Sequence, residues 1–291
     1  MQEPLDELIR LLDLEDLEVN LFRGVSPQGD SQRVFGGQVL GQALIAAGRT
    51  TEGLHANSLH AYFLRPGDPS TPILYQVDRT KDGRSFTTRR VIAIQHGRAI
   101  FHLEASFHRP ETGFSHQDAM PDVPDPESLP TWRERFEPLV GDAPEGVRKW
   151  AMQPRPIDSR YVTWANPLEP EKLPPRMLVW IRADGALPAE QLMQQCIVAY
   201  ASDMTLLDTA ALPHQIAWID ESYTIASLDH AMWFHHDFRA DDWLLYAQES
   251  PAAAGGRGFS TGRLFTRDGR LVVSVVQEGL FRRRGNRAAS L

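Results

Sequence analysis

Four short motifs occur twice along this chain, in the same order and at a nearly constant spacing. His60-Ala61-Tyr62-Phe63 returns as His230-Ala231-Met232-Trp233, and Gly83-Arg84-Ser85-Phe86 returns as Gly256-Arg257-Gly258-Phe259. Leu74-Tyr75 and His96-Gly97-Arg98 return as Leu245-Tyr246 and Asp268-Gly269-Arg270, so every offset lies between 170 and 173 residues. Because chance rarely repeats four motifs in order, the chain is predicted to be a tandem duplication of one structural unit.

Each predicted unit is a helix followed by antiparallel strands. In the first half a helix is expected from Gly37 to about Thr50, followed by strands at 58–64, 73–80, 85–95 and 99–108, with turn signals between them. In the second half a strand is expected from Arg176 to Ala183. The next helix then extends from about Pro188 to Asp203, and Ser227 to Phe234 opens the strands. A helix followed by an antiparallel meander indicates an α+β fold.

The two units are joined by a proline-rich stretch. Twelve of the 21 prolines lie between Pro121 and Pro175. Proline fixes the backbone and cannot donate to a sheet, so we expect a long connection with short helical pieces such as 131–139. The predicted domains are therefore 1–115, 116–175 and 176–291, the first beginning with an amphipathic helix over residues 4–18.

Composition excludes several classes of protein. A net charge of −8 argues against a protein that neutralises nucleic-acid phosphates. The single cysteine, Cys196, excludes internal disulfides and lies on an apolar helix face, as a core residue would. No stretch reaches the ~20 apolar residues of a membrane span, and the acidic N-terminus is unlike a signal peptide. The C-terminus, Ala289-Ser290-Leu291, lacks the basic middle residue of a peroxisomal S-K-L signal, so a cytoplasmic location is expected.

An aspartate at a helix end is the first candidate for chemistry. Asp203 lies where the helix dipole disfavours a negative charge, which would tend to raise its pKa. Ser227, at the start of the following buried strand, could face it. Gln277 is unusual because it places an amide inside the apolar strand VVSVVQEGLF. Each residue also has an ordinary structural interpretation: a helix-end acid, a strand-edge hydroxyl and an amide that satisfies a neighbouring backbone group.

Three other patterns are weaker candidates. Ser260 lies in Gly258-Phe259-Ser260-Thr261-Gly262, the G-x-S-x-G spacing of serine hydrolases, but a predicted hairpin follows it where that chemistry needs a helix. His235 and His236 with Asp237, and His230 upstream, could suggest a metal site, although adjacent histidines on a strand point to opposite faces. The glycines near Gly36 do not form G-x-G-x-x-G and lack a βαβ unit, so no dinucleotide is expected. We therefore expect no cofactor and no metal.

Seven segments together resemble one known family. LFRG, VFGGQVLGQAL, HAYFLRPGD, DGRSFTTRRV, YASD, DHAMWFH and VVQEG are similar to segments of the bacterial acyl-CoA thioesterase II (TesB-type) family, over about residues 4 to 283. The resemblance implies a double hotdog fold, in which each half is a long helix wrapped by an antiparallel sheet. It also implies hydrolysis of acyl-CoA to free fatty acid and CoA. The implied catalytic residues are Asp203, Ser227, which replaces a frequent threonine, and Gln277.

The chemistry suits these side chains. The CoA thiol has a pKa near ~8.5 and can leave as a thiolate, so the reaction mainly needs an activated water. Asp203 would act as general base, with Ser227 and Gln277 holding the water or the carboxylate, and no covalent intermediate is needed. Arg84, Arg89, Arg257 and Arg263 are possible partners for CoA phosphates. The family also suggests a homodimer or homotetramer. A non-hydrolytic acyl-CoA sensor stays open as the alternative, and a serine esterase using Ser260 is a distant third.

Overall fold

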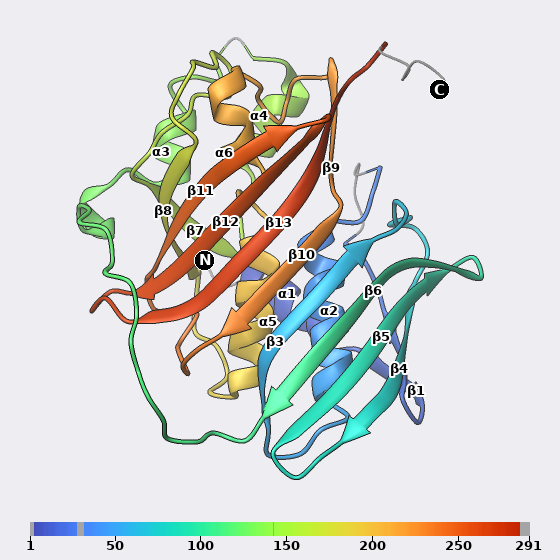
Figure 1. Ribbon diagram of the computed structural model, residues 1–291. Helices are drawn as coiled ribbons and strands as arrows, with labels where there is room; N and C mark the ends of the chain where they lie inside the picture. The colour runs from blue at the N-terminus through green and yellow to red at the C-terminus, as the bar shows by residue number, and fades with distance from the viewer. Residues whose placement is uncertain (1–2, 28–31, 142, 286–291) are drawn as a thin grey trace.

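The strands of this protein form one large antiparallel sheet with two long helices against one face (Figure 1). The computed structural model describes residues 3–27, 32–141 and 143–285. Within them the strand order is β1-β2-β4-β5-β6-β3-β10-β13-β12-β11-β8-β7, with β9 pairing on β13. The helices α2 (Gly36–Gly48) and α5 (Gln191–Ser202) pack against each other on the inner face. Helix and sheet thus bury a shared apolar core.

The predicted duplication is confirmed by the strand order. The N-terminal half contains β2 (Leu21–Gly24), β3 (His55–Phe63), β4 (Ile73–Asp82), β5 (Phe86–Gln95) and β6 (Arg98–His108). The C-terminal half contains β8 (Arg176–Ala183), β10 (Asp229–Phe234), β11 (Leu244–Ala254), β12 (Arg257–Thr266) and β13 (Leu271–Arg283). β1 and β7 are the outermost strands. Inside them, the strands of each half follow the same order towards the centre, β2-β4-β5-β6-β3 and β8-β11-β12-β13-β10. The fold is α+β, and it is a double hotdog.

The two halves meet at a pair of equivalent strands. In the antiparallel pair of β3 and β10, Ala61 lies opposite His230, and His60 lies opposite Ala231. These are the repeated His-Ala residues, so the two copies of the motif lie side by side at the junction. Backbone hydrogen bonds therefore continue across the junction, and the sheet is uninterrupted between the halves (Figure 1).

Small residues let the central helices approach closely. A Cβ added to Gly41 of α2 would lie 3.2 Å from the carbonyl oxygen of Cys196 on α5. Cys196 is fully buried in the core, as its position on the apolar face predicted. Buried glutamines of α5 bind both halves: Gln195 donates to the Ala56 carbonyl of β3, and Gln194 donates to the Pro188 carbonyl. The helix that ends at Asp203 is consequently held on both sides.

The halves differ in the segment that comes after the central helix. Only residues 49–54 separate α2 from β3, whereas residues 203–228 separate α5 from β10. The longer segment contains α6 (Asp208–Ala211), a 3₁₀ turn η2 (Leu212–His214) and β9 (Tyr223–Ser227). None of these three elements was predicted. They lie between the two residues, Asp203 and Ser227, that sequence reasoning selected first.

The proline-rich connection is more structured than expected. It contains η1 (Pro126–Ser128), α3 (Trp132–Phe136), α4 (Glu145–Met152) and a strand, β7 (Ile157–Tyr161), which pairs with β8. No proline lies within 157–161, so these residues can pair. Earlier in the connection, Trp180 of β8 donates to the Pro124 carbonyl, and Trp243 donates to Glu127. The connection thus covers an aromatic cluster on the outer face of the C-terminal half. The three-part domain division at 115 and 175 stays a prediction.

The expected helix over residues 4–18 is wrong in its second part. Helix α1 (Glu3–Leu12) ends early, and β1 (Glu15–Glu18) follows it and pairs with β2. Four exposed residues, three of them acidic, would otherwise extend a helix at its negative end, which disfavours acids. The structure contains no helix in its described ranges that is long and apolar enough to cross a membrane. The C-terminal Ala289-Ser290-Leu291, used above to predict a location, lies outside the described residues.

Candidate active site

Asp203 is the C-terminal cap of α5 and is almost fully buried. Its side chain is 4% exposed. It lies opposite the first turn of α2, where a Cβ added to Gly36 would come within 2.6 Å of Asp203 Oδ2. The Gly37 backbone N–H donates to the same carboxylate. Phe35, the cap residue of α2, offers no side-chain hydrogen bond to this turn. The end of one central helix and the start of the other thus enclose the carboxylate.

The structure brings the three predicted residues together around one oxygen atom. Gln277 Nε2 donates to Asp203 Oδ1 at 2.6 Å, and Ser227 Oγ donates to the same atom at 3.3 Å. Gln277 Nε2 also donates to Ser227 Oγ at 2.9 Å. Ser227 ends β9, and Gln277 lies in the middle of β13, so β9 pairing on β13 explains their proximity. The amide that looked out of place in an apolar strand has two polar partners.

Burial sets the protonation behaviour of the aspartate. It raises the pKa of Asp203 from 3.8 to about 6, because a carboxylate loses its hydration in this site. Hydrogen bonds from Gln277, Ser227 and the Gly37 N–H act in the opposite direction and lower the pKa. The carboxylate is therefore ionised near neutral pH, yet more basic than an exposed one. Such a group can accept a proton from water.

A pocket of about 590 Å³ opens over this carboxylate, between the two halves of the chain. The wall from the N-terminal half comes from the start of α2, residues 63–67 and the start of β6. The wall from the C-terminal half comes from the end of α5, the start of α6, Trp218 and residues 225–228. The lining is mainly apolar, and Arg33 and Arg65 are its basic residues. A ligand here would lie at the junction of the duplicated units.

Comparisons with known proteins identify the family of this chain. The sequence pattern described as "Acyl-CoA thioesterase" matches residues 150–280, and that described as "Acyl-CoA thioesterase N-terminal domain" matches residues 25–108. The chain belongs to the acyl-CoA thioesterase family. The acyl-coenzyme A thioesterase 8 of Homo sapiens is 42% identical to it over 281 residues, covering 94% of this chain and 88% of the human protein.

Two solved structures extend the agreement. A crystal structure of an acyl-CoA thioesterase II TesB2 from Mycobacterium marinum is 44% identical, with a TM-score of 0.79, and covers 96% of this chain and 100% of that one. A conserved protein with a hotdog fold from Alicyclobacillus acidocaldarius has a TM-score of 0.75 at 19% identity, covering 95% and 98%. The first supports the family, and the second supports the fold alone.

In this family member only the C-terminal half has the three candidate residues. Arg49 caps α2 where Asp203 caps α5, and it forms ion pairs with Asp13 and Asp16. Applying the offset of the last repeated motif places Ala105 of β6 at the position of Gln277. Neither the carboxylate nor the amide therefore has a counterpart in the first half.

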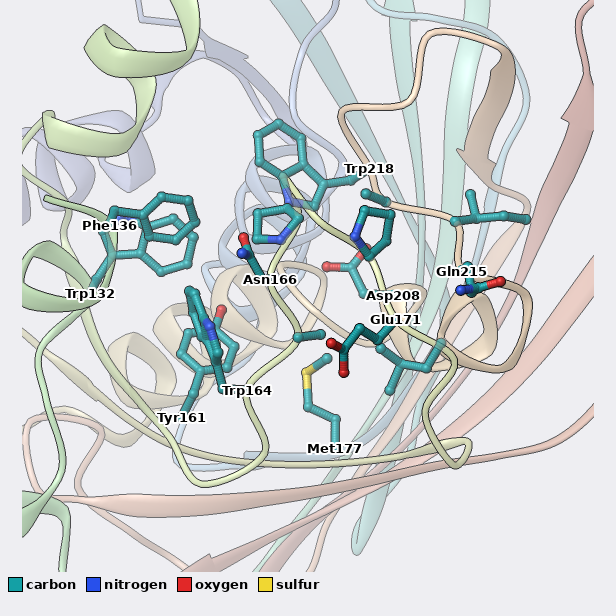
Figure 2. Close-up of a pocket in the computed structure, with 16 residues that line it drawn as sticks. Trp132, Phe136, Tyr161, Trp164, Asn166, Glu171, Met177, Asp208, Gln215 and Trp218 are labelled. Carbon is teal, nitrogen blue, oxygen red and sulfur yellow. The ribbon is translucent and has the colours of Figure 1, made fainter. Parts of the chain in front are cut away.

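A second cavity adjoins the pocket of this thioesterase family member. Aromatic residues of the connection line one side of it, and Asn166, Glu171, Asp208 and Gln215 line the other (Figure 2). Asp208 and Trp218 belong to the walls of both cavities. Burial raises the pKa of Asp208 to about 7, and the negative Asp203 adds to this rise. Sequence reasoning missed Asp208, because nothing in the pattern LLDTAAL distinguishes it from a surface acid.

The weaker sequence candidates lie elsewhere. Ser260 is a buried residue of β12 within a hairpin, as predicted, so it is not on a strand-to-helix turn. His235 contacts Ser274, and no group of three metal-ligating side chains occurs in the described part of the chain. Arg89 is buried and bonded to Thr50 and Asp82, so its suggested role with CoA phosphates is wrong. Arg263 pairs with Asp118 and Glu249.

Proposed function

We propose that this protein hydrolyses acyl-CoA thioesters to free fatty acid and CoA by general-base activation of water. Asp203 takes the proton from the water, while Ser227 and Gln277 hold the carboxylate and the water in place. The observation that supports this most is the convergence of both donors on Oδ1 of a buried carboxylate whose pKa is about 6. A general base works best with a pKa near the operating pH.

The chemistry requires no further catalytic group for the leaving sulfur. A thiol with a pKa near ~8.5 can depart as a thiolate, so a strong acid beside it is unnecessary. The proton taken up by Asp203 can be returned to the products. Gln277 and Ser227 both donate to Oδ1, and Oδ2 lies next to Gly36 of the pocket wall, so we assign the water to Oδ2.

Negative charge develops on the thioester oxygen during attack. The first turn of α2 adjoins the carboxylate and has no side-chain cap. The uncapped N–H groups of a helix start, together with its positive dipole end, stabilise an oxyanion. Because the Gly37 N–H already donates to Asp203, we propose that the Gly36 N–H and the positive end of α2 stabilise the tetrahedral intermediate.

The pocket suggests how the rest of the substrate lies. Arg33 and Arg65 are basic residues in the pocket wall of the N-terminal half, where CoA phosphates would meet positive charge. On the opposite side, Trp218 and Asp208 lead towards the aromatic cavity (Figure 2). We propose that the CoA moiety lies on the arginine side and the acyl chain points towards Trp218.

Assembly and location are further parts of the proposal. The outer face of the C-terminal half is covered by the connection, whereas Tyr62 and Phe86 on the outer face of the N-terminal half are about half exposed. Exposed aromatic residues on a sheet favour association, so we propose a homodimer or homotetramer. A cytoplasmic location is a separate part of the proposal. Size-exclusion chromatography with light scattering tests the assembly, and a monomer at micromolar concentration would contradict it.

Thiol release from acyl-CoAs of several chain lengths tests the proposed reaction. We expect turnover by the wild type and a loss of roughly 100-fold or more in Asp203→Asn, which keeps the shape and removes the base. Asp229→Asn is the matched control, because Asp229 is a nearby half-buried aspartate outside the three-residue set. Equal turnover in wild type and Asp203→Asn would refute Asp203 as the base. Tight binding without turnover in the wild type would favour the sensor.

A further inference from the structure

Three buried polar side chains form a row across the sheet beneath α5. Ser260 of β12 pairs with Gln277 of β13 in the antiparallel register. Ala231 of β10 pairs with Val276, so continuing that register by one residue places His230 beside Gln277 on the other side. All three side chains are fully buried. The row therefore reads His230, Gln277, Ser260, with the candidate catalytic amide in the middle.

Each member of this row has one buried polar atom without a hydrogen-bond partner. Across the described residues, these atoms are His230 Nδ1, Gln277 Oε1 and Ser260 Oγ. Three such atoms in adjacent strands are unusual, because most buried polar atoms are bonded. One acceptor with two lone pairs, Oε1, lies between two groups that can each donate one proton. Small rotations of the two flanking side chains would satisfy all three atoms.

The orientation of the Gln277 amide follows from its other contacts. Nε2 lies 2.6 Å from Asp203 Oδ1 and 2.9 Å from Ser227 Oγ. Exchanging Nε2 and Oε1 would set an amide oxygen against a carboxylate oxygen at that distance, which is repulsive. Oε1 therefore points back into the sheet, towards His230 and Ser260. An amide held only from the Nε2 side could rotate.

The proton on His230 can be assigned in the same way. Burial lowers the pKa of His230 to about 3, so its ring is neutral and carries one proton, while the Gln277 amide acts in the opposite direction. Nε2 lies 2.9 Å from Ser202 Oγ, and Nδ1 lies 3.9 Å from Asp203 Oδ1. A lone pair on Nδ1 would face that carboxylate, so the tautomer with the proton on Nδ1 is favoured. Ser202 Oγ, which also lies 2.9 Å from the Ala199 carbonyl oxygen, then directs its single proton to Nε2.

We propose that His230 and Ser260 are positioning residues of the active site, which donate to Oε1 of Gln277 and thereby fix the amide that orients Asp203. The proposal rests on the function proposed above. It gives a role to the serine of the G-x-S-x-G sequence without making it a nucleophile. It also orders the hydrogen bonds in one direction, from Ser202 through His230 and Gln277 to the carboxylate. Such networks polarise one another.

The proposal has a consequence for the pH dependence of the reaction. The hydrogen bond from Gln277 lowers the pKa of Asp203, so an amide that rotates away should let this pKa rise further. Most other titratable and charged groups around Asp203 stay in place in the variants and are shared with the wild type. They are Tyr246 from β11, Asp208 from α6, Tyr200 from α5, and Arg33 and Arg65 from the pocket wall. His230 from β10 also faces Asp203 and is itself replaced in some variants, so Ser260→Ala is the variant that leaves all of these groups unchanged.

Four variants test the proposal by their pH–rate profiles. Ser260→Ala and His230→Leu each remove one donor, and we expect the acid limb of kcat/KM to move upward by about half a pH unit or more. We expect kcat near neutral pH to fall several-fold, with KM nearly unchanged. His230→Asn places an amide N–H near the position of Nδ1 and should retain most of the wild-type profile. Ser260→Ala combined with His230→Leu should lower kcat more than either change alone.

Two further variants separate positioning from stability. Ser250→Ala removes a buried hydroxyl that donates to the Phe259 carbonyl beside the row, and His60→Asn changes the exposed repeat counterpart of His230. Both should keep the wild-type acid limb, even if Ser250→Ala melts earlier. An acid limb that stays in place in Ser260→Ala and His230→Leu overturns the proposal. If His230→Leu does not fold, Ser260→Ala decides. Full activity of Asp203→Asn would instead overturn the proposed function.

Discussion

The buried carboxylate of Asp203 should lower the stability of the protein at neutral pH. Burial raises its pKa from 3.8 to about 6. At 1.36 kcal/mol per pKa unit, ionising this group in the folded state costs about 3 kcal/mol more than in the unfolded chain. The folded pKa is the higher one, so this cost is complete above pH ~6 and disappears as the pH falls towards the unfolded value. The active site is thus a source of instability.

Asp203→Asn should therefore stabilise the protein while it removes the proposed base. The amide keeps an acceptor for Gln277 and Ser227 but loses the bond from the Gly37 N–H, so we expect a net gain of roughly 1–2 kcal/mol near neutral pH. Urea unfolding of both proteins at pH values near about 7.5 and about 4.5 measures it, and the advantage of the variant should shrink by about 2 kcal/mol at the lower value.

Asp122→Asn is the control for this measurement, because Asp122 is exposed in the connection. It should change the unfolding free energy little and by the same amount at both pH values. The reasoning is refuted if Asp203→Asn is less stable than the wild type at neutral pH, or if its advantage does not depend on pH.

Three other changes test the site. The kcat/KM of the wild type should fall about tenfold per pH unit below the Asp203 pKa of about 6, so a profile that is flat down to pH ~5 would exclude this carboxylate as the base. Gly36→Ala should lower kcat on the order of 100-fold, since its Cβ would lie 2.6 Å from Asp203 Oδ2 and 2.9 Å from the Phe63 ring. Gly113→Ala, with nothing within 4 Å, should be neutral in the same thiol-release assay. Asp208→Leu should raise kcat/KM for long acyl chains relative to short ones, because a carboxyl beside an alkyl chain must be desolvated; an unchanged chain-length profile would exclude Asp208 from the acyl path.

Repetition and periodicity predicted most strands of the sheet, but not β1, β7 or β9. The strand from Arg176 to Ala183 was predicted to the residue, and the hairpin around Asp268 and Gly269 was also found. These segments are short runs rich in apolar, β-branched and aromatic residues between strong turn signals, and local pattern decides them. The repeated motifs predicted that the two halves share one architecture, and both halves have the same strand order.

Other parts depend on tertiary contacts that no local pattern carries. β7 forms because β8 offers an open edge, and α1 stops where residues 15–18 can pair with β2. In the site, Gln277 was noticed because an amide interrupts an apolar strand. His230 was considered only for a weak metal site and Asp208 was not noticed, since a buried histidine in a strand and an acid after a helix are common in ordinary cores and surfaces. Only the register of β10 against β13 brings His230 beside Gln277.

The junction of β3 and β10 also restricts how the molecule can move. Two domains that clasp a ligand between them usually rotate about a few linking residues. Here the candidate pocket lies between halves that share one hydrogen-bonded sheet, and α2 packs on α5. Rotation of one half against the other would break that ladder. We therefore expect substrate entry and product release to depend on small local displacements near Trp218, which lies between η2 and β9 and belongs to the pocket wall without belonging to the shared sheet ladder.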